Sequence, residues 1–355
     1  MTARTDVAIV GATGVTGGIA FDEAERLGLA PIALGRNAAK LQAFLTQRGL
    51  AADRFRVVDI HDPASLDRAF SDVRIVISTV APFRENGIEI ASAAARAGIA
   101  YTDPSGESGF LQSILKLDAT ANQSGATLCP GNGIAAFLGD IAIHSIVVPS
   151  RDRSGGVLYD IQGYRPTGGS IKSYLTSILP VGSPRIRNGQ VELRPFADYA
   201  GTVAGIAGFN TVVPDALVVS RYWQPTQFDS LGKAGKEPRI VARILSGALT
   251  DTFLSRLLMK LPFDNWLVFD PNKDAKSSVT VHAEVIAQDG TSHRRVIMGR
   301  AIYQLTGRIL AATAKAMFDH DHLPRGVRAA SEVFSSFENA LALTGAQEIT
   351  NDGQT

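Results

Sequence analysis

The chain has 355 residues, which is enough for two domains with sizeable cores. Hydrophobic residues make up 45% and charged residues 19%, the balance of an ordinary soluble globular protein. The formal net charge of +1 argues against a nucleic-acid partner, because it offers no large electrostatic attraction to phosphates. The single cysteine, Cys129, excludes an intramolecular disulfide and any multi-cysteine zinc site.

The same features favour a cytoplasmic protein. A lone cysteine fits a reducing compartment. The chain runs almost at once into a strand, so no signal peptide is predicted. No run of about 18 apolar residues occurs, so no spanning helix is predicted either. Residues 319–322 read Asp-His-Asp-His shortly before Pro324, which favours an exposed turn, and no metal site is predicted.

The most informative pattern lies close to the start of the chain. Residues 7–10 are fully apolar, as expected of a buried parallel strand, and residues 19–27 have the spacing of a helix. Between them lie four glycines at close spacing, namely Gly11, Gly14, Gly17 and Gly18. Strand, glycine turn and helix are the context in which a glycine fingerprint indicates a dinucleotide site. The spacing is G-x-x-G-x-x-G rather than the G-x-G-x-x-G of many dehydrogenases, so an ordinary glycine turn is the alternative.

Each part of this turn has a predicted role. Gly11 permits the tight turn, Gly14 lets a pyrophosphate approach the backbone, and Gly17 and Gly18 allow the helix to pack close to the sheet. The start of the helix offers free N–H groups and the positive end of the helix dipole to the phosphates. The predicted contacts are Gly11, Thr13, Gly14, Val15, Thr16 and Gly17.

The end of the second strand distinguishes the two nicotinamide cofactors. This strand is predicted over residues 31–34 and is followed by Arg36. An acidic residue here would bind the ribose 2′-hydroxyl of NAD, whereas an arginine accommodates the 2′-phosphate of NADP. No Asp or Glu occurs between Pro31 and Gln47, so we predict NADP(H), with Arg36 as the main contact and Lys40 as a helper. The alternative is a solvated arginine at a strand end.

Four further strands complete a doubly wound α/β domain. They are predicted at residues 55–60, 73–80, 99–102 and 126–129, with helices between them. Open sheets of this kind bind ligands at the carboxyl ends of their strands. The residues at this edge that we expect to contact the cofactor are Asp59, Ile60, Val80, Ala81, Pro82, Ser105 and Gly106.

The pattern changes after residue 133. Strand and helix signals there predict an α+β domain, with a helix at 135–148, strands at 157–164, 279–287 and 293–305, and a helix at 307–319. Residues 180–275 give a weak signal, although 245–261 is predicted to be a helix that packs on the second domain's sheet. A lid or a membrane-surface contact is the alternative for that helix.

The predicted fold class is therefore α/β, a Rossmann doubly wound parallel sheet with an inserted α+β second domain. The cofactor domain covers residues 1–133 and about 320–350, because a last amphipathic helix at 326–343 is expected to return to it. The second domain covers residues 134–319 and is expected to close over the cofactor and to contact the substrate. Its long hairpin strands could pair across a two-fold axis, which predicts a homodimer.

Several short motifs occur in a characteristic order. They are Gly11-Ala-Thr-Gly-Val-Thr-Gly-Gly18, Gly35-Arg36-Asn37, Tyr101-Thr-Asp-Pro-Ser-Gly-Glu107, Pro130-Gly-Asn-Gly133, Gly168-Gly169-Ser170 and Pro324-Arg-Gly-Val-Arg-Ala-Ala-Ser331. Together they resemble the saccharopine dehydrogenase-like oxidoreductases, including the trans-acting enoyl reductases. The resemblance covers most of the first domain and scattered points beyond it.

The resemblance implies a Rossmann domain, an α+β domain inserted before the last helices, and an NADP-dependent reduction. Gly169-Ser170 stands where the family usually has Gly-Thr. Members of the family act on amino-acid imines and on enoyl lipids, so the resemblance does not identify a substrate.

A second class of reductase is excluded by a simple test. Short-chain dehydrogenases use a Tyr-x-x-x-Lys pair, in which the lysine lowers the pKa of the tyrosine. None of the seven tyrosines in this chain has a lysine four residues later. That mechanism is therefore absent in its usual form.

Three residues are candidates for acid–base or substrate-binding roles. Asp103 and Glu107 follow the fifth strand, where a buried carboxyl group could donate a proton or bind a cationic imine. The alternative is that both fix the loop by accepting backbone N–H bonds. Lys172 follows Gly168-Gly169 and could meet a carboxylate or phosphate, or simply be solvated.

The function predicted from the sequence is an NADPH-dependent reductase. Its target would be a C=N or polarised C=C bond in a small to medium organic substrate. An oxidative NADP-dependent dehydrogenase acting on an amine or alcohol is one alternative. A non-catalytic NADP-binding sensor or scaffold protein is the other.

Overall fold

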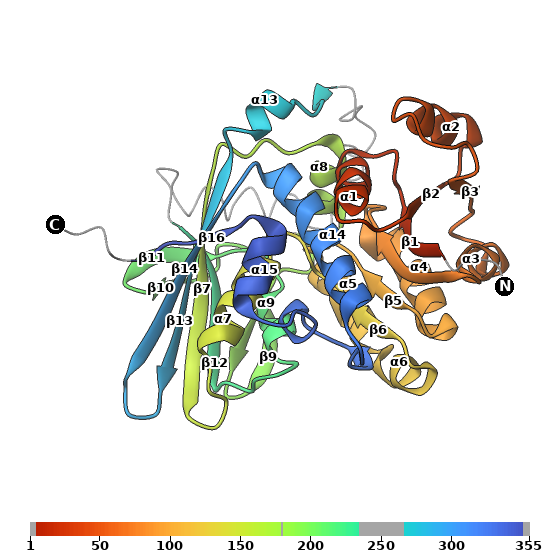
Figure 1. The fold of residues 1–355 in the computed structure, drawn as a ribbon. Helices are drawn as coiled ribbons and strands as arrows, with labels where there is room; N and C mark the ends of the chain where they lie inside the picture. Colours follow the sequence, from red (N-terminus) through yellow and green to blue (C-terminus); the bar gives the residue numbers. More distant parts are fainter. Residues whose placement is uncertain (1–4, 179, 234–265, 351–355) are drawn as a thin grey trace. The chain divides into compact units, whose positions relative to one another are not determined.

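The computed structural model describes residues 5–178, 180–233 and 266–350 (Figure 1). The chain divides into two compact units. Unit 1 comprises Met1–Ser105, Gln112–Gly133 and Tyr303–Thr344. Unit 2 comprises Gly106–Leu111, Ile134–Ile302 and Gly345–Thr355. The helix predicted at residues 245–261 lies outside the described residues.

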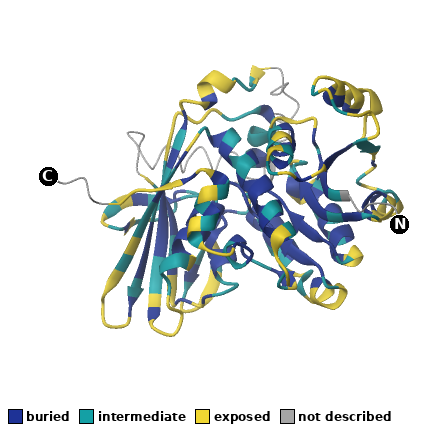
Figure 2. Cartoon of the chain, in the orientation of Figure 1, coloured by how far each residue is buried: buried dark blue, intermediate teal, exposed yellow. Residues whose placement is uncertain are grey.

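Unit 1 is built on a seven-stranded sheet in the order β15-β6-β5-β4-β1-β2-β3, with every pair parallel. The strands are β1 (Thr5–Val10), β2 (Pro31–Gly35), β3 (Phe55–Val57), β4 (Val73–Ser78), β5 (Ala100–Thr102), β6 (Thr127–Cys129) and β15 (Gly326–Val327). The central strands are covered on both faces, which their continuous apolar runs require, and Figure 2 shows them buried. The predicted Rossmann fold is confirmed.

Helices connect these strands. They are α1 (Val15–Arg26), α2 (Ala38–Thr46), α3 (Pro63–Phe70), α4 (Phe83–Ala97), α5 (Ser108–Leu115), α6 (Asp118–Ser124), α14 (Ile302–Asp319) and α15 (Phe337–Thr344). Parallel crossovers are right-handed, so connections that run in opposite directions from β1 place their helices on opposite faces. Phe21 of α1 meets Phe44 of α2 edge to face, with the ring centroids 5.1 Å apart. On the other face, α4 contacts both α3 and α6.

The return of the C-terminal part to unit 1 depends on one close approach. A Cβ atom on Gly307 of α14 would lie 2.8 Å from Cβ of Ile19 in α1. The two helices therefore touch at a point where one of them has no side chain. The C-terminal helices thus pack on unit 1, as the predicted fold class requires.

The single helix predicted at residues 326–343 is wrong. Gly326 has φ +91°, outside the helical region. Its N–H donates to the carbonyl of Ala126 at 2.8 Å, which makes β15 a seventh strand beside β6. A 3₁₀ turn (Ala330–Glu332) and α15 then follow.

The strand predicted at residues 293–305 also ends earlier. β14 stops at Arg300, because Ala301 takes a positive φ of 56° and the backbone turns into α14. The N–H of Ile302 donates to Oγ of Ser277 at 2.9 Å, which fixes that turn. Residues 301–305 are therefore a turn and the start of a helix.

Unit 2 is built on a nine-stranded mixed sheet in the order β10-β11-β12-β7-β13-β14-β16, with β8 and β9 branching from β12. Its strands are β7 (Asp152–Gln162), β8 (Ser183–Arg187), β9 (Gln190–Arg194), β10 (Ala200–Val203), β11 (Ile206–Asn210), β12 (Gln227–Lys233), β13 (Ser278–Ala287), β14 (Ser292–Arg300) and β16 (Gln347–Glu348). Its helices are α7 (Phe137–Ile146), α8 (Gly168–Ser173), the π-helix η1 (Tyr174–Ile178), α9 (Asp215–Val219) and α13 (Pro271–Asp274). Alternate residues of β13 are buried, including Val279 and Val281, and α7 packs on this sheet.

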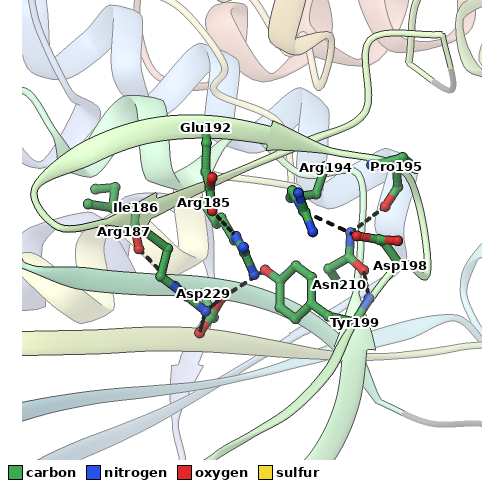
Figure 3. Close-up of polar contacts among 10 residues, drawn as sticks. All are labelled: Arg185, Ile186, Arg187, Glu192, Arg194, Pro195, Asp198, Tyr199, Asn210 and Asp229. Atoms are coloured by element: carbon green, nitrogen blue, oxygen red, sulfur yellow. Dashed lines mark hydrogen bonds and ion pairs between the residues drawn. The ribbon is translucent and has the colours of Figure 1, made fainter.

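An arginine network fastens the β8–β9 branch to the sheet (Figure 3). Arg187 of β8 donates to both carboxylate oxygens of Asp229 in β12, each at 2.8 Å. Tyr199 donates its hydroxyl to the same carboxylate at 2.8 Å. The Arg185 guanidinium stacks 4.6 Å from the centre of the Tyr199 ring. The arginines thus have acidic and aromatic partners, so the network stabilises the attachment of β8 and β9 to β12.

A buried carboxyl group lies on the α7 side of the same sheet. Asp215 of α9 is 1% exposed, and the Tyr159 hydroxyl donates to its Oδ1 at 2.6 Å. Burial raises the pKa of Asp215 to about 8, and the nearby Asp140 carboxylate acts in the same direction. Asp215 is therefore protonated in the folded protein at neutral pH.

We expect Asp215→Asn to flatten the pH dependence of the stability of unit 2. The folded carboxyl group keeps its proton up to about pH 8, whereas in the unfolded chain it ionises near pH 4, so stability falls across this window as the pH rises. Between about pH 6 and pH 8 the wild type should lose about 2 kcal/mol of unfolding free energy and the variant should not. Urea denaturation followed by tryptophan fluorescence measures this, because Trp223 is 2% exposed and reports on unit 2.

Asp289→Asn is the matched control. Asp289 lies in an exposed turn, where hydrogen bonds from Thr291 lower its pKa, so it titrates only in acid. That variant should keep the wild-type slope between pH 6 and pH 8. An Asp215→Asn variant with the same slope as the wild type would show that Asp215 is already ionised when folded.

Candidate cofactor site

The glycine turn between β1 and α1 has no room for side chains at two positions. Gly11 has φ +87°, and a Cβ atom there would lie 2.8 Å from Oγ1 of Thr79. A Cβ atom on Gly17 would collide with the carbonyl oxygen of Gly11 and lie 2.7 Å from Oγ1 of Thr79. Real Cβ atoms essentially never come this close, so glycine is required at both positions.

The other two glycines are less constrained. A Cβ atom on Gly14 would lie 3.3 Å from the Gly11 carbonyl oxygen, and one on Gly18 would make only ordinary contacts from 3.5 Å. Close packing of the helix on the turn therefore depends on Gly17, and Gly18 is not needed for it. We predicted this role for both glycines, and the geometry gives it to one.

The start of α1 is open. Gly14 is its N-cap residue, no side chain caps it, and its first turn carries no acidic residue. Thr13, Gly14 and Val15 are exposed. Unpaired N–H groups and the positive end of the helix dipole therefore meet solvent here, which is what an anionic phosphate requires.

Thr79 completes this corner and was missing from the predicted site residues. Its N–H donates to the carbonyl of Val10 at 2.9 Å, and its hydroxyl lies 3.0 Å from the same oxygen and 3.2 Å from the carbonyl of Gly11. Thr79 thus ties the end of β4 to the turn after β1. Its position near the carboxyl end of the strand predicted at residues 73–80 was the available signal.

The end of β2 leaves a free cation. Arg36 is exposed and makes no ion pair or hydrogen bond with any described residue. Asn37 caps α2 by accepting a hydrogen bond from the Lys40 N–H at 3.0 Å, which places Lys40 in the first turn with an exposed side chain. A guanidinium that pairs with no acidic side chain in the described part of the chain is available for a phosphate.

The ends of β3 and β4 carry the next predicted residues. β3 ends at Val57, so Asp59 and Ile60 lie in a loop rather than in a strand. The Asp59 carboxylate accepts a hydrogen bond from the N–H of His61 at 3.0 Å. After β4, Val80 and Pro82 are half-buried and Ala81 is exposed, with a cis peptide bond between Ala81 and Pro82.

Asp103 is held by the backbone at the end of β5. It is fully buried, and its Oδ1 accepts hydrogen bonds from the N–H groups of Ser105 at 2.7 Å and Gly131 at 3.2 Å. Two residues earlier, Tyr101 is also fully buried. Burial, followed by the charge of Asp103, raises the pKa of Tyr101 well above its usual value, so the hydroxyl stays protonated. This geometry supports the loop-fixing alternative for Asp103.

Asp103 and Ser105 belong to unit 1. Three other predicted site residues belong to unit 2, namely Gly106, Glu107 and Lys172. Glu107 is 1% exposed and directly precedes α5. Gly106 is half-buried, and Lys172 is half-buried within α8. Among the described residues, no three histidine, cysteine or carboxylate side chains form a group that could hold a metal ion. No described helix is both long and apolar enough to span a bilayer.

The chain is similar in sequence to proteins named trans-acting enoyl reductases. One from Mycobacterium ulcerans is 29% identical over 181 residues, which cover 48% of this chain and 43% of the relative. One from Mycobacterium bovis is 25% identical over 291 residues, covering 70% of this chain and 69% of the relative. The first match thus spans less than half of that relative's length. No protein-family model matches the chain.

The fold is similar to that of a solved saccharopine dehydrogenase (L-Glu forming) from Saccharomyces cerevisiae. The two share 14% sequence identity, and the comparison covers 98% of this chain and 100% of the other with a TM-score of 0.58. The likeness at this identity concerns the fold. The resemblance to the saccharopine dehydrogenase-like family, seen first in the motifs, is confirmed.

We expect Gly17→Ala to weaken nucleotide binding strongly, while Gly18→Ala leaves it nearly unchanged. The first substitution forces α1 away from the Gly11 carbonyl, whereas the second adds a methyl group where there is room. Titration of the nicotinamide fluorescence of NADPH should show a dissociation constant at least tenfold higher for Gly17→Ala. This corresponds to a loss of about 1.4 kcal/mol of binding free energy. Equal affinities for the two variants would show that the nucleotide does not use this turn.

Proposed function

We propose that this chain is an NADP(H)-dependent oxidoreductase that reduces a C=N or polarised C=C bond in a small to medium organic substrate. The observation that carries the proposal is the turn after β1. Its two obligatory glycines, its uncapped helix and its place at the carboxyl ends of parallel strands are the features of a dinucleotide pyrophosphate site. An ordinary connecting turn needs none of them.

The proposed placement of the cofactor follows the strand ends. The pyrophosphate lies on the turn from Gly11 to Gly17, with Thr13, Val15 and Thr16 beside it. The 2′-phosphate pairs with Arg36, with Lys40 as a helper. The free guanidinium of Arg36 supports this choice of NADP(H) over NAD(H).

Two further regions complete this proposed placement. The adenine lies near Asp59 and Ile60, in the loop after β3. The nicotinamide lies near the ends of β4 and β5, where the predicted contacts are Val80, Ala81, Pro82, Ser105 and Gly106. Supporting this assignment, Val80 and Pro82 keep part of their surface accessible.

The kind of bond is proposed from chemistry and from the names of the relatives. A bound reduced nicotinamide supplies a hydride, and the reaction then needs a proton for the other atom of the double bond. The enoyl reductases named above favour a C=C bond conjugated to a carbonyl group. A C=N bond stays open, because a buried carboxyl group could bind a cationic imine as well.

Of the three predicted catalytic residues, Glu107 and Lys172 stay proposed as such, whereas Asp103 is proposed to act through the loop that it holds. The Oδ1 atom of Asp103 is engaged by backbone N–H groups, so this carboxylate is better suited to orient the loop than to give up a proton. Glu107 is buried and Lys172 is half-buried, which suits a proton donor and a substrate contact respectively. We also propose a homodimer, formed by the long hairpin strands of unit 2.

The engaged carboxylate of Asp103 also favours a second candidate, a protein that binds NADP without turnover. The two candidates differ in one measurable respect. An enzyme oxidises bound NADPH when its substrate is supplied, whereas a sensor does not.

We expect Arg36→Ala to lower the affinity for NADPH towards that for NADH. The wild type should bind NADPH at least tenfold more tightly, because the guanidinium pairs with the 2′-phosphate. Fluorescence titration of both nucleotides measures this, and Arg26→Ala is the control, because Arg26 is a surface arginine paired with Glu23. Equal affinities of the wild type for both nucleotides would exclude the 2′-phosphate contact, and no binding of either would exclude the proposed function.

We expect turnover in a screen of imines and α,β-unsaturated thioesters, ketones and aldehydes. Consumption of NADPH is followed by its absorbance. Glu107→Gln should then lower kcat/KM by about a hundredfold or more, as typical for a lost acid–base group, and Lys172→Ala should lower it through the lost substrate contact. Unchanged kcat/KM in both would exclude them as catalytic residues.

A further inference from the structure

The loops after β5 and β6 interlock within unit 1. The N–H of Asn132 donates to the carbonyl of Asp103 at 2.6 Å, and the N–H of Gly131 donates to the Asp103 carboxylate. A Cβ atom on Gly133 would lie 2.6 Å from the carbonyl oxygen of Pro104. The two loops thus touch backbone to backbone, and no side chain fits between them.

Asn132 fastens this contact to the strands below. It is 2% exposed, and its Nδ2 group lies 2.8 Å from Oγ1 of Thr102, 2.8 Å from the carbonyl oxygen of Cys129 and 3.1 Å from the Cys129 sulfur. One side-chain amide therefore joins the last residue of β5 to the last residue of β6. A buried amide with these partners orients the backbone on both sides of it.

Only one residue of this assembly reaches the surface. Asp103, Ser105, Gly131, Asn132 and Gly133 are buried, whereas Pro104 is half-buried. Pro104 follows the end of β5 by two residues, and β5 is the strand next to β4, whose end carries the proposed nicotinamide contacts. The buried residues thus form a rigid support, and Pro104 is its accessible part.

We infer that Asn132 and Asp103 are positioning residues for the nicotinamide half of the cofactor. They hold Pro104 as a fixed wall against which the nicotinamide ring lies. This inference rests on the proposed function, because it presumes that NADP(H) binds at this edge. It assigns a role to Asn132, which lies in the Pro130–Gly133 motif without a predicted role, and it gives Asp103 a role in place of proton donation.

The inference separates two ligands that differ only in the nicotinamide. The affinity for NADPH should depend on the position of Pro104. The affinity for 2′-phospho-ADP-ribose, which lacks the nicotinamide ring, should not. Asn132→Asp keeps the size of the side chain but removes the Nδ2 donor and places a charge beside the Cys129 carbonyl and the Thr102 hydroxyl. Gly133→Ala displaces Pro104, because the added Cβ atom would collide with the carbonyl oxygen of Pro104.

The experiment is a calorimetric titration of the wild type and both variants with NADPH and with 2′-phospho-ADP-ribose. We expect both variants to bind NADPH about tenfold more weakly and 2′-phospho-ADP-ribose within about twofold of the wild type. Asn122→Asp and Gly18→Ala are matched controls. Asn122 also donates to a backbone carbonyl in unit 1, but from an exposed position, and Gly18 has room for a methyl group.

A second measurement uses the wild type and does not depend on folding of a variant. Amide hydrogen exchange of Ser105, Gly131 and Asn132 should slow on binding NADPH and stay unchanged on binding 2′-phospho-ADP-ribose. Equal protection by both ligands, or equal loss of affinity for both in the variants, would overturn the inference. The interlocked loops after β5 and β6 would then stabilise unit 1 as a whole. If the wild type bound neither ligand, the proposed function itself would fail.

Discussion

The structure of unit 1 depends on the contact between Gly17 and the carbonyl of Gly11. Because neither residue has a side chain, the first turn of α1 sits directly on the end of β1, and Thr79 closes the corner from β4. This contact sets the direction in which the free N–H groups of α1 point. The sheet order then brings the ends of β2, β4 and β5 around the same corner. A single steric condition thus places the phosphate-binding end of the helix and the strand ends that surround it.

The parts of the fold that follow local rules could be predicted from the sequence. Apolar runs such as residues 7–10 read as buried strands, and the glycines after them fixed the turn. β15 could not be predicted, because its two residues become a strand only by pairing with β6 about two hundred positions earlier in the chain. The hydrogen bonds of Asn132 that join the loops after β5 and β6 could not be predicted for a related reason. A side-chain amide that satisfies three acceptors on other residues leaves no periodic trace in the sequence.

Unit 2 uses polar groups in a different way. Its polar groups hold strands and helices together, as the half-buried Arg187 and Tyr199 do at Asp229, and as the buried Tyr159 does at Asp215. A carboxyl group that stays protonated in the core is a neutral hydrogen-bonding group, so it avoids the cost of burying an uncompensated charge. These clusters account for much of the polar chemistry of the unit without requiring a ligand.

The seventh strand has a consequence for the order in which the protein is made. β6 emerges from the ribosome with one edge open, and β15, which covers it, follows only after the Ile134–Ile302 part of unit 2 has been synthesised. An unpaired edge of a parallel sheet is a template for wrong pairing. The edge of β6 therefore stays unpaired while most of the chain is translated. Any shortening of the chain before Gly326 would make that exposure permanent.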